Sequence, residues 1–271
     1  MPTPTMVVCL MLGALLMPFG SVVAAQKPNA DASHCSKEIL RNFVVRDKPE
    51  SKGGVVQGTV DIWNTAGSKA FFYVSRMEVD ADGAPNAYNS KNTGLDDLRN
   101  AGGPGNWYGL VTDENGNPVI QAEGDPFPGF YVSPTSLRDP TITKESDPRR
   151  YVDAAKVPYL VLPPAVAKLA KTWLGDFATV VNLDNGKVSS AIYADAGNSF
   201  KIGEGSIALA EALGIGSNPR TGNSARHVFY LVFPGSGNHK PRPLAEINEE
   251  GKRLFESWGG MTRVNQCVGL M

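Results

Sequence analysis

The 271-residue chain is 42% hydrophobic, 20% charged and 8% aromatic, and it contains 29 glycines and 20 prolines. The apolar fraction excludes wholesale disorder, and the many glycines and prolines predict turns over a compact core rather than a protein of long helices. Lys and Arg (26) nearly balance Asp and Glu (27), which argues against a nucleic-acid-binding protein that depends on a basic surface. Three cysteines and three histidines are too few for a zinc-finger or multi-metal protein.

An apolar run near the N-terminus indicates the compartment. Residues 6–23 are almost entirely apolar and are followed by two alanines, a pattern typical of a secretory signal peptide cleaved after Ala25. We therefore expect a signal peptide over residues 1–25, then a polar tether over residues 26–54 with one short element near residues 39–45. The mature protein is expected to be secreted or periplasmic, without stable membrane association. An uncleaved membrane anchor is the alternative, because the run approaches the length that spans a bilayer.

Two cysteines, Cys35 and Cys267, stay in the mature chain and lie near its opposite ends. An oxidising compartment permits a disulfide between them, which the chain-entropy model values at roughly 4–5 kcal/mol. Two unpaired buried thiols are the alternative. Export of the mature chain to an oxidising compartment favours the disulfide over the two free thiols.

Residues 55–271 are expected to form a single catalytic domain. Strands are predicted over residues 70–79, 107–111, 119–122, 129–133, 157–162, 177–183, 187–194 and 227–233, with Asn-Gly turns in two expected hairpins. Helices are predicted over residues 163–173, 207–213 and 244–258. Ser206 is typical of the N-cap of the second helix, and Gly214 is typical of its end. Many short strands with a few helices indicate a β-rich α+β domain.

Two acidic residues in the window 184–215 suggest chemistry. Asp195 follows a predicted strand, and Glu204 lies two residues before the expected helix N-cap. Hydrolysis of a glycosidic bond requires such a pair, with one carboxyl protonated and the other ionised. The positive end of the helix favours the ionised form of Glu204, which makes Glu204 the better base and Asp195 the better acid, and the exchanged roles stay open as the alternative. The alternative is a turn aspartate followed by a helix-start glutamate, without function.

Several segments carry a family resemblance. They are residues 74–83 with Asp80-Ala-Asp82-Gly83, 124–133, 150–153, 157–163 and 194–206 with Asp195 and Gly203-Glu204-Gly205-Ser206. Residues 191–215 resemble the late strand–loop–helix part of double-psi β-barrels, a group that includes endoglucanases, lytic transglycosylases and expansin-like proteins. The set as a whole, which covers most of residues 71–234, resembles glycoside hydrolase family 75, the fungal-type chitosanases.

This resemblance implies a six-stranded double-psi β-barrel-like core with a few peripheral helices. It also implies a secreted endo-acting hydrolase that cleaves β-1,4 links of chitosan, or of a related amino-sugar polymer, with inversion. Asp195 and Glu204 match the family's catalytic pair, and inversion predicts carboxyl groups roughly 6.5–9.5 Å apart. The loop between the two residues is shorter than in the fungal pattern. Residues 93–109 include an insert more typical of bacterial relatives, so the exact polymer stays open.

A cationic polymer requires acidic and aromatic side chains along its groove. The candidate substrate-binding residues are Asp80, Asp82, Trp107, Tyr108, Asp125 and Tyr131. Each has a simpler explanation as a turn acid or a core aromatic. Asp80 and Asp82 also suit a short cation-binding loop, but an EF-hand is excluded because its twelfth position is Lys91.

We expect no cofactor and no metal, and a monomer that binds a polysaccharide but no nucleic acid. Two alternatives to chitosan hydrolysis stay open: a non-catalytic glycan- or cell-wall-binding barrel, and a peptidoglycan-cleaving lytic enzyme. Other chemistries lack their motifs, because the chain has no serine nucleophile elbow, no closely spaced zinc ligands and no phosphate-binding glycine loop in the required context.

Overall fold

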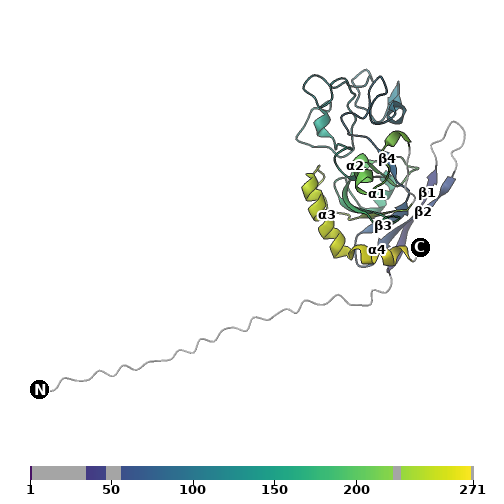
Figure 1. Ribbon diagram of the computed structural model, residues 1–271, viewed down its shortest axis with the longest axis vertical. Coiled ribbons are helices and arrows are strands. Elements are labelled where there is room, and N and C mark those ends of the chain that lie inside the picture. Colours follow the sequence, from purple (N-terminus) through teal and green to yellow (C-terminus); the bar gives the residue numbers. More distant parts are fainter. Residues whose placement is uncertain (2–34, 47–55, 222–226, 270–271) are drawn as a thin grey trace. The chain divides into compact units, whose positions relative to one another are not determined.

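The computed structural model describes residues 1, 35–46, 56–221 and 227–269 (Figure 1). The predicted signal peptide lies outside the described residues except for Met1. Of the predicted tether, only residues 35–46 are described, and its one element forms a strand, β1 (Lys37–Arg46). This strand pairs antiparallel with β2 (Val56–Thr65), so the segment belongs to the main sheet.

The described strands form one nine-stranded sheet in the order β1-β2-β3-β11-β8-β9-β7-β10-β4, and a separate two-stranded hairpin of β5 and β6. The other strands of the large sheet are β3 (Phe71–Ser75), β4 (Glu78–Asp80), β7 (Tyr159–Leu162), β8 (Phe177–Asn182), β9 (Val188–Ala196), β10 (Glu204–Ser206) and β11 (Val228–Val232). The hairpin consists of β5 (Gly102–Gly103) and β6 (Asn106–Trp107).

Part of the large sheet closes on itself. Strands β3 and β4 are separated in the chain only by Arg76 and Met77, yet β3 pairs with β11 and β4 pairs with β10. The path from β3 through β11, β8, β9, β7 and β10 therefore returns to the same stretch of chain at β4. Two of its pairings, β7 with β9 and β10 with β4, are parallel, and the others are antiparallel. The ends of strands far apart in sequence thus meet at one rim.

The helices cover this sheet and its ends. The α-helices among the described residues are α1 (Pro164–Ala170), α2 (Ile207–Ala212), α3 (Leu244–Trp258) and α4 (Gly260–Val268). Short 3₁₀ helices are η1 (Leu98–Ala101), η2 (Pro148–Arg150) and η3 (Pro219–Thr221). Figure 1 shows α3 along the outside of the sheet, against β8 and β9, and α4 at the end away from the long loops that precede β7.

Both faces of the closed part are buried, as β11 illustrates. Tyr230 and the valines at both ends of β11 pack in a cluster with α1 and α2, whereas Phe229 and Leu231 pack in a second cluster with α3 and α4. All five side chains are fully buried. Alternate side chains of a strand point to opposite faces, so each face has its own core. This rigid frame positions the loops at its rim.

The predicted disulfide is confirmed: Cys35 and Cys267 are bonded, with Cα atoms 4.8 Å apart. The bond joins Cys35, two residues before β1, to α4 and so ties together two ends of the described fold. Among the described residues, no helix combines the length and the apolar character that crossing a bilayer requires.

The predicted β-rich α+β class is confirmed, whereas the six-stranded double-psi topology stays a prediction. The hairpin of β8 and β9, strand β11, and the capping of α2 by Ser206, whose Oγ accepts from the Leu209 N–H, are also as predicted. The strand predicted over 70–79 is broken into β3 and β4, and α4 was not predicted.

Three strands predicted between residues 107 and 133 are wrong. That region contains the short β6 and only isolated bridges, including Thr112 with Pro118 and Ile120 with Tyr131. A proline lacks the backbone N–H that extends a ladder, and this stretch contains three, Pro118, Pro126 and Pro128. The turn at 113–117 still forms, since the Asp113 N–H donates to the carbonyl of Asn117.

Candidate active site

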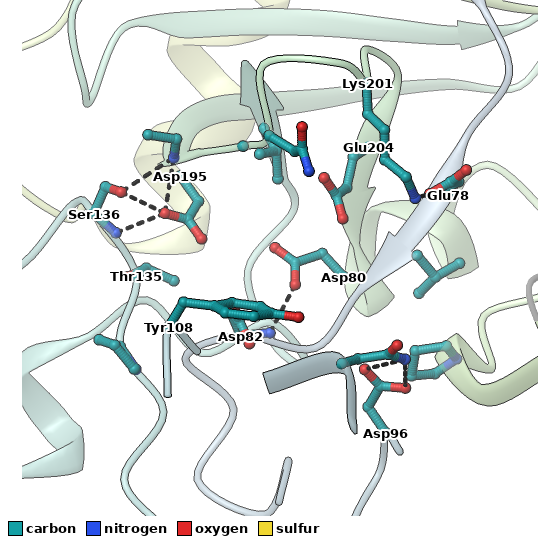
Figure 2. Close-up of a pocket in the computed structure, with 18 of the residues that line it drawn as sticks. Glu78, Asp80, Asp82, Asp96, Tyr108, Thr135, Ser136, Asp195, Lys201 and Glu204 are labelled. Carbon is teal, nitrogen blue, oxygen red and sulfur yellow. Dashed lines mark hydrogen bonds and ion pairs between the residues drawn. The ribbon is translucent and has the colours of Figure 1, made fainter. Parts of the chain in front are cut away.

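A pocket of about 830 Å³ opens at the rim of the closed sheet (Figure 2). Residues of β4, β7, β9 and β10 line it, together with loop residues before β7. Its lining includes acidic and basic side chains: Glu78, Asp80, Asp82, Asp96, Asp195 and Glu204, with Arg76 and Lys201. Carboxyl groups outnumber basic groups in this lining.

Strand pairing places Asp195 and Glu204 on either side of one residue. Val161 of β7 is aligned with Asp195 of β9 and, on its other side, with Glu204 of β10. Neighbouring strands are about 4.8 Å apart, so two such steps separate the backbones at Asp195 and Glu204 by roughly 10 Å. All three residues line the pocket. The fold thus presents two carboxyl groups to one cavity from strands that share a neighbour.

An irregularity in β9 sets the direction of Asp195. Tyr193 is aligned with Leu160, but Asp195 is aligned with Val161, so Ala194 is an extra residue in β9. Such a β-bulge bends the strand and shifts the faces to which the following side chains point. Tyr193 and Leu160 pack in the cluster of α1 and α2, whereas Val161 packs in the other. The bulge therefore turns Asp195 to the same face of the sheet as Val161.

The carboxylate of Asp195 is held by three hydrogen bonds. Its Oδ1 accepts from the Ser136 N–H (2.8 Å), from the Ser136 Oγ (2.5 Å) and from the Ala196 N–H (2.8 Å). Figure 2 shows Ser136 approaching Asp195 from the loop before β7. Burial raises the pKa of Asp195, and the hydrogen bonds from Ser136 and Ala196 act against that rise. The carboxyl is fixed in orientation, and its hydrogen bonds offset part of the rise in its pKa.

Glu204 lies in a different environment. Burial and then the charge of Asp80 raise its pKa from 4.5 to about 8, while Lys201 acts in the opposite direction. The Lys201 ammonium forms an ion pair with Glu78, which is aligned with Glu204 on β4. The helix-dipole argument predicted an ionised Glu204, and the direction of the shift is the reverse. Desolvation of a buried carboxyl outweighs the partial charge at the start of the short α2.

Close chain packing keeps Glu204 at the pocket. Gly203 has φ +92°, and a Cβ there would lie 2.1 Å from the carbonyl oxygen of Arg76. Only glycine fits this backbone and this approach. The Glu78 N–H donates to the carbonyl of Gly203, which aligns β4 with β10.

Asp80 lies near the centre of the pocket, between Asp195 and Glu204 in the view of Figure 2. Its Oδ1 accepts from the Asp82 N–H (2.9 Å), and its Oδ2 accepts from the Tyr159 hydroxyl (2.9 Å). Burial and then the charge of Asp195 raise the pKa of Asp80 to about 7. Asp80 is thus poised to gain or lose a proton near neutral pH.

Asp82 completes a compact group of carboxyls. Its Oδ1 accepts from the hydroxyls of Tyr88 (2.9 Å) and Ser133 (3.2 Å), and burial and then the charge of Asp80 raise its pKa well above 3.8. Among the described residues, Asp80, Asp82 and Asp195 are a group that could hold a cation, because one oxygen from each lies within 4.8 Å of the others. Protonation of one of these carboxyls relieves the same repulsion, and the pKa of Asp80, raised to about 7, makes Asp80 a candidate to hold that proton.

Of the predicted substrate-binding residues, the structure places Asp80, Asp82 and Tyr108 at the pocket, and the Tyr108 side chain is 60% exposed. The other three do not line it. Trp107 and Tyr131 are partly buried and pack against the core, and Asp125 forms an ion pair with Arg149 at 3.3 Å. A ring with an open face, such as that of Tyr108, suits stacking on a sugar.

Sequence reasoning missed several residues of the pocket. Ser136 is 59 residues from Asp195, and no local motif marks a serine that will orient a distant carboxylate. Tyr159 lies behind the pocket, and its contact with Asp80 through the hydroxyl was not predicted. Lys201 lies inside the sequence window that contains both candidate acids, so a basic residue near them could have been noted from the sequence. Its ion pair with Glu78 depends on the pairing of β4 with β10, which the sequence did not reveal.

Comparison with known protein families finds a match that covers the acidic residues of the pocket. The family model described as fungal chitosanase of glycosyl hydrolase group 75 matches residues 77–263, which include every acidic residue of the pocket. Comparison with curated proteins finds no match to the chain.

Proposed function

Because this chain belongs to the fungal chitosanases of glycosyl hydrolase group 75, it is a glycoside hydrolase, and we propose that it cleaves β-1,4 links of chitosan or a related amino-sugar polymer with inversion. In this proposal, Asp195 and Glu204 perform the chemistry. The observation that carries the proposal is that the two carboxyls face one acidic pocket but have different environments.

The environments divide the roles of acid and base. Glu204, whose pKa is raised to about 8, keeps its proton at neutral pH and is suited to protonate the leaving glycosidic oxygen. Asp195 accepts hydrogen bonds from Ser136 and Ala196, which favour the ionised form that activates a water molecule. This assignment exchanges the roles expected from the helix dipole, because burial decides the protonation of Glu204.

The strand arrangement supports inversion. An inverting enzyme needs carboxyls roughly 6.5–9.5 Å apart, so that a water molecule fits between one of them and the sugar. Two strand spacings, through Val161, give a backbone separation of roughly 10 Å between Asp195 and Glu204. Asp195 also contributes least among the influences on the pKa of Glu204, in keeping with that separation. If β3 and β4 are counted as one interrupted strand, the closed path has six strands, the number in the double-psi barrel expected for this site.

The charge of the pocket supports an amino-sugar polymer as substrate. Chitosan carries an ammonium group on each deacetylated sugar, and the pocket offers more carboxyls than basic groups. Tyr108 presents an open ring on which a sugar can stack. Peptidoglycan carries no such regular row of ammonium groups, so the acidic lining favours chitosan.

The decisive experiment measures new reducing ends from highly deacetylated chitosan. The wild-type protein should release them, and Glu204→Gln and Asp195→Asn should each lower kcat by at least about a hundredfold. Glu211→Gln, which changes an exposed carboxyl on α2 outside the pocket, is the matched control and should keep wild-type activity. The anomeric configuration of the first product, followed by NMR, should show inversion.

Three outcomes would contradict parts of this proposal. Activity in Glu204→Gln and Asp195→Asn would mean that other carboxyls act. A product with retained configuration would exclude the inverting mechanism. Release of an anhydro sugar from peptidoglycan, without hydrolysis of chitosan, would favour the lytic alternative.

We also infer that the protein acts after export. The Cys35–Cys267 disulfide requires an oxidising environment to persist, and the apolar run over residues 6–23 resembles a signal peptide. Mass spectrometry of protein recovered outside the cell should find a mature N-terminus at residue 26 and a disulfide between these two cysteines.

A further inference from the structure

The insert over residues 93–109 supplies one wall of the pocket, and the catalytic proposal gives it no role. Asp96, Asn100 and Tyr108 all come from this insert and all line the pocket. Figure 2 shows Asp96 and Tyr108 across the pocket from Glu204. The Tyr108 N–H donates to the carbonyl of Ala101, so the backbone that carries the Tyr108 ring is hydrogen-bonded to the end of η1.

The carboxylate of Asp96 is buried and oriented. Both of its oxygens accept from the Asn100 side-chain amide (2.9 and 3.1 Å), and Oδ1 also accepts from the Asp97 N–H (2.7 Å). Its Oδ2 accepts from the Tyr88 hydroxyl at 3.2 Å. Only 5% of Asp96 is exposed, yet it lines the pocket. These four hydrogen bonds occupy the lone pairs of the carboxylate, so Asp96 attracts a cationic ligand through a negative charge held at a defined position.

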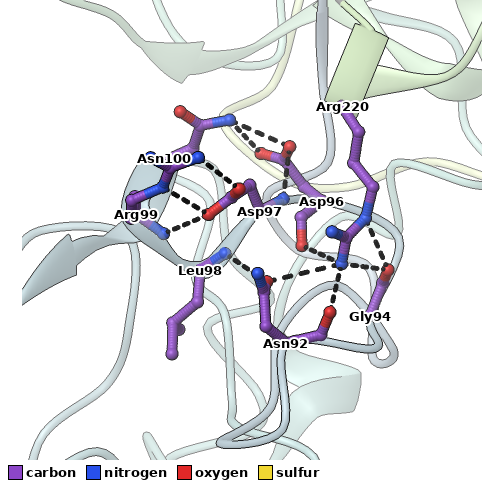
Figure 3. Close-up of polar contacts among 8 residues, drawn as sticks. All are labelled: Asn92, Gly94, Asp96, Asp97, Leu98, Arg99, Asn100 and Arg220. Atoms are coloured by element: carbon purple, nitrogen blue, oxygen red, sulfur yellow. Dashed lines mark hydrogen bonds and ion pairs between the residues drawn. The ribbon is translucent and has the colours of Figure 1, made fainter.

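Arg220 holds the stretch of chain that ends at Asp96 (Figure 3). Its Nη2 donates to the carbonyls of Asn92 (2.8 Å), Gly94 (2.9 Å) and Asp96 (2.9 Å), and its Nε donates to Gly94 (3.2 Å). These partners precede Arg220 by 124 to 128 residues. A planar guanidinium holds several donors in one fixed geometry and loses less side-chain freedom for each hydrogen bond than an ammonium does.

Arg220 connects the wall formed by the insert with the part of the chain that follows Glu204. It lies in η3, next to Pro219, which also lines the pocket, and η3 follows Glu204 and α2 in the chain. We propose that Asp96 and Tyr108 form a subsite for one glucosamine unit, with Arg220 as the positioning residue that fixes Asp96. The sugar ring lies on Tyr108, and the charge of Asp96 attracts its ammonium group. This inference rests on the proposed chitosanase activity.

Arg99 provides a natural comparison. It is a neighbouring arginine in the same insert, but its side chain is 89% exposed and it pairs with Asp97 at 2.8 Å. It contacts neither the pocket nor the carbonyls that Arg220 binds, as Figure 3 also shows. Arg99→Ala therefore removes an arginine from the wall without altering the proposed subsite.

The test compares KM and kcat on glucosamine oligomers and on oligomers rich in N-acetylglucosamine. Asp96→Asn should raise KM for the glucosamine oligomers about tenfold, as expected for loss of a nearby buried charge, with kcat within about twofold of wild type. KM for the acetylated oligomers should change less, because they lack the ammonium group. Arg220→Ala should show the same pattern, Arg220→Lys a smaller effect, and Arg99→Ala none.

A double variant distinguishes positioning from independent binding. If Arg220 acts through Asp96, then Asp96→Asn combined with Arg220→Ala should raise KM no further than the larger single effect. Additive effects would overturn the positioning role, and an unchanged KM in Asp96→Asn would overturn the subsite. Arg220→Lys replaces Arg220→Ala if the latter fails to fold.

The subsite and the catalytic proposal can fail separately. If the wild-type protein does not hydrolyse chitosan, the proposed function fails. Calorimetric binding of glucosamine oligomers to wild type and to Asp96→Asn then still tests the subsite. Equal affinities would overturn it, and weaker binding by Asp96→Asn would support it.

Discussion

At the scale of single residues, the protonation of Glu204 depends on its neighbour Asp80. The charge of Asp80 is the largest influence on the Glu204 pKa after burial. Asp80→Asn removes that charge, so the pKa of Glu204 should fall and the alkaline limb of the kcat/KM profile should move to lower pH by about one unit. Rates on chitosan oligomers from pH 4 to 9 measure the shift, with Glu211→Gln as the control. An alkaline limb that does not move would exclude Glu204 as the acid.

Ser136 controls the other carboxyl. Its Oγ and its N–H both donate to Oδ1 of Asp195, and Ser136→Ala keeps the N–H bond while it removes the Oγ bond to Asp195 and the bond that Oγ accepts from the Ala196 N–H. The pKa of Asp195 should rise, so the acidic limb of the kcat/KM profile should move to higher pH and kcat should fall by about tenfold. The same profiles test this, and Ser136→Thr, which keeps a hydroxyl, should restore part of the activity. A shift of the alkaline limb alone would contradict Asp195 as the base.

At the scale of secondary structure, the space between β7 and β10 restricts the loop after β9. A Cβ on Gly197 would lie 2.8 Å from Cγ1 of Val161 and 3.4 Å from Oε2 of Glu204. Gly197→Ala should displace Glu204 and lower kcat by about tenfold, with an overpacking cost of about 1–3 kcal/mol in the free energy of unfolding. Gly103→Ala is the control, since a Cβ there meets nothing within 4 Å. Wild-type kcat in Gly197→Ala would show that Glu204 tolerates movement.

The regular elements were predictable and the irregular ones were not. Strand β11 is a dense apolar run and α2 has a serine N-cap and a following glycine, so local pattern sufficed for both. The bulge before Asp195 left no mark in the sequence, because an extra residue in a strand is defined only by its partner. The pair of acids was likewise found from strand and helix ends, whereas Ser136 and Arg220 act over long sequence separations that only the fold brings together.

At the scale of the whole molecule, the disulfide closes a very long loop. Cys35 and Cys267 are 232 residues apart, and Lys37, just after Cys35, also donates to the carbonyl of Cys267. Replacing both cysteines by alanine should lower the free energy of unfolding by about 2–5 kcal/mol. Activity at 25 °C should persist, because neither cysteine lines the pocket. Urea unfolding and chitosan hydrolysis of the double variant test the two statements, and unchanged stability would refute the first.

The buried acids should also make stability depend on pH. The pKa of Asp80 is raised from 3.8 to about 7, and that of Glu204 from 4.5 to about 8, both mainly by burial. Between these folded values and the ordinary ones, the folded protein binds more protons than the unfolded chain. The free energy of unfolding must therefore fall as the pH rises through this window, by a few kcal/mol in total.

Exposed acids oppose this trend only at lower pH. Hydrogen bonds lower the pKa values of Asp113 and Asp139, and the stability that such groups contribute is lost as the pH falls through their folded values. Maximal stability is therefore expected near pH 4 to 5 rather than at neutrality. Urea unfolding at pH 5 and pH 8 should show the wild type less stable at pH 8, and Asp80→Asn combined with Glu204→Gln should remove most of the difference. Equal stability of the wild type at both values would mean that these carboxyls are ionised in the folded state, which would also remove the basis for Glu204 as the proton donor.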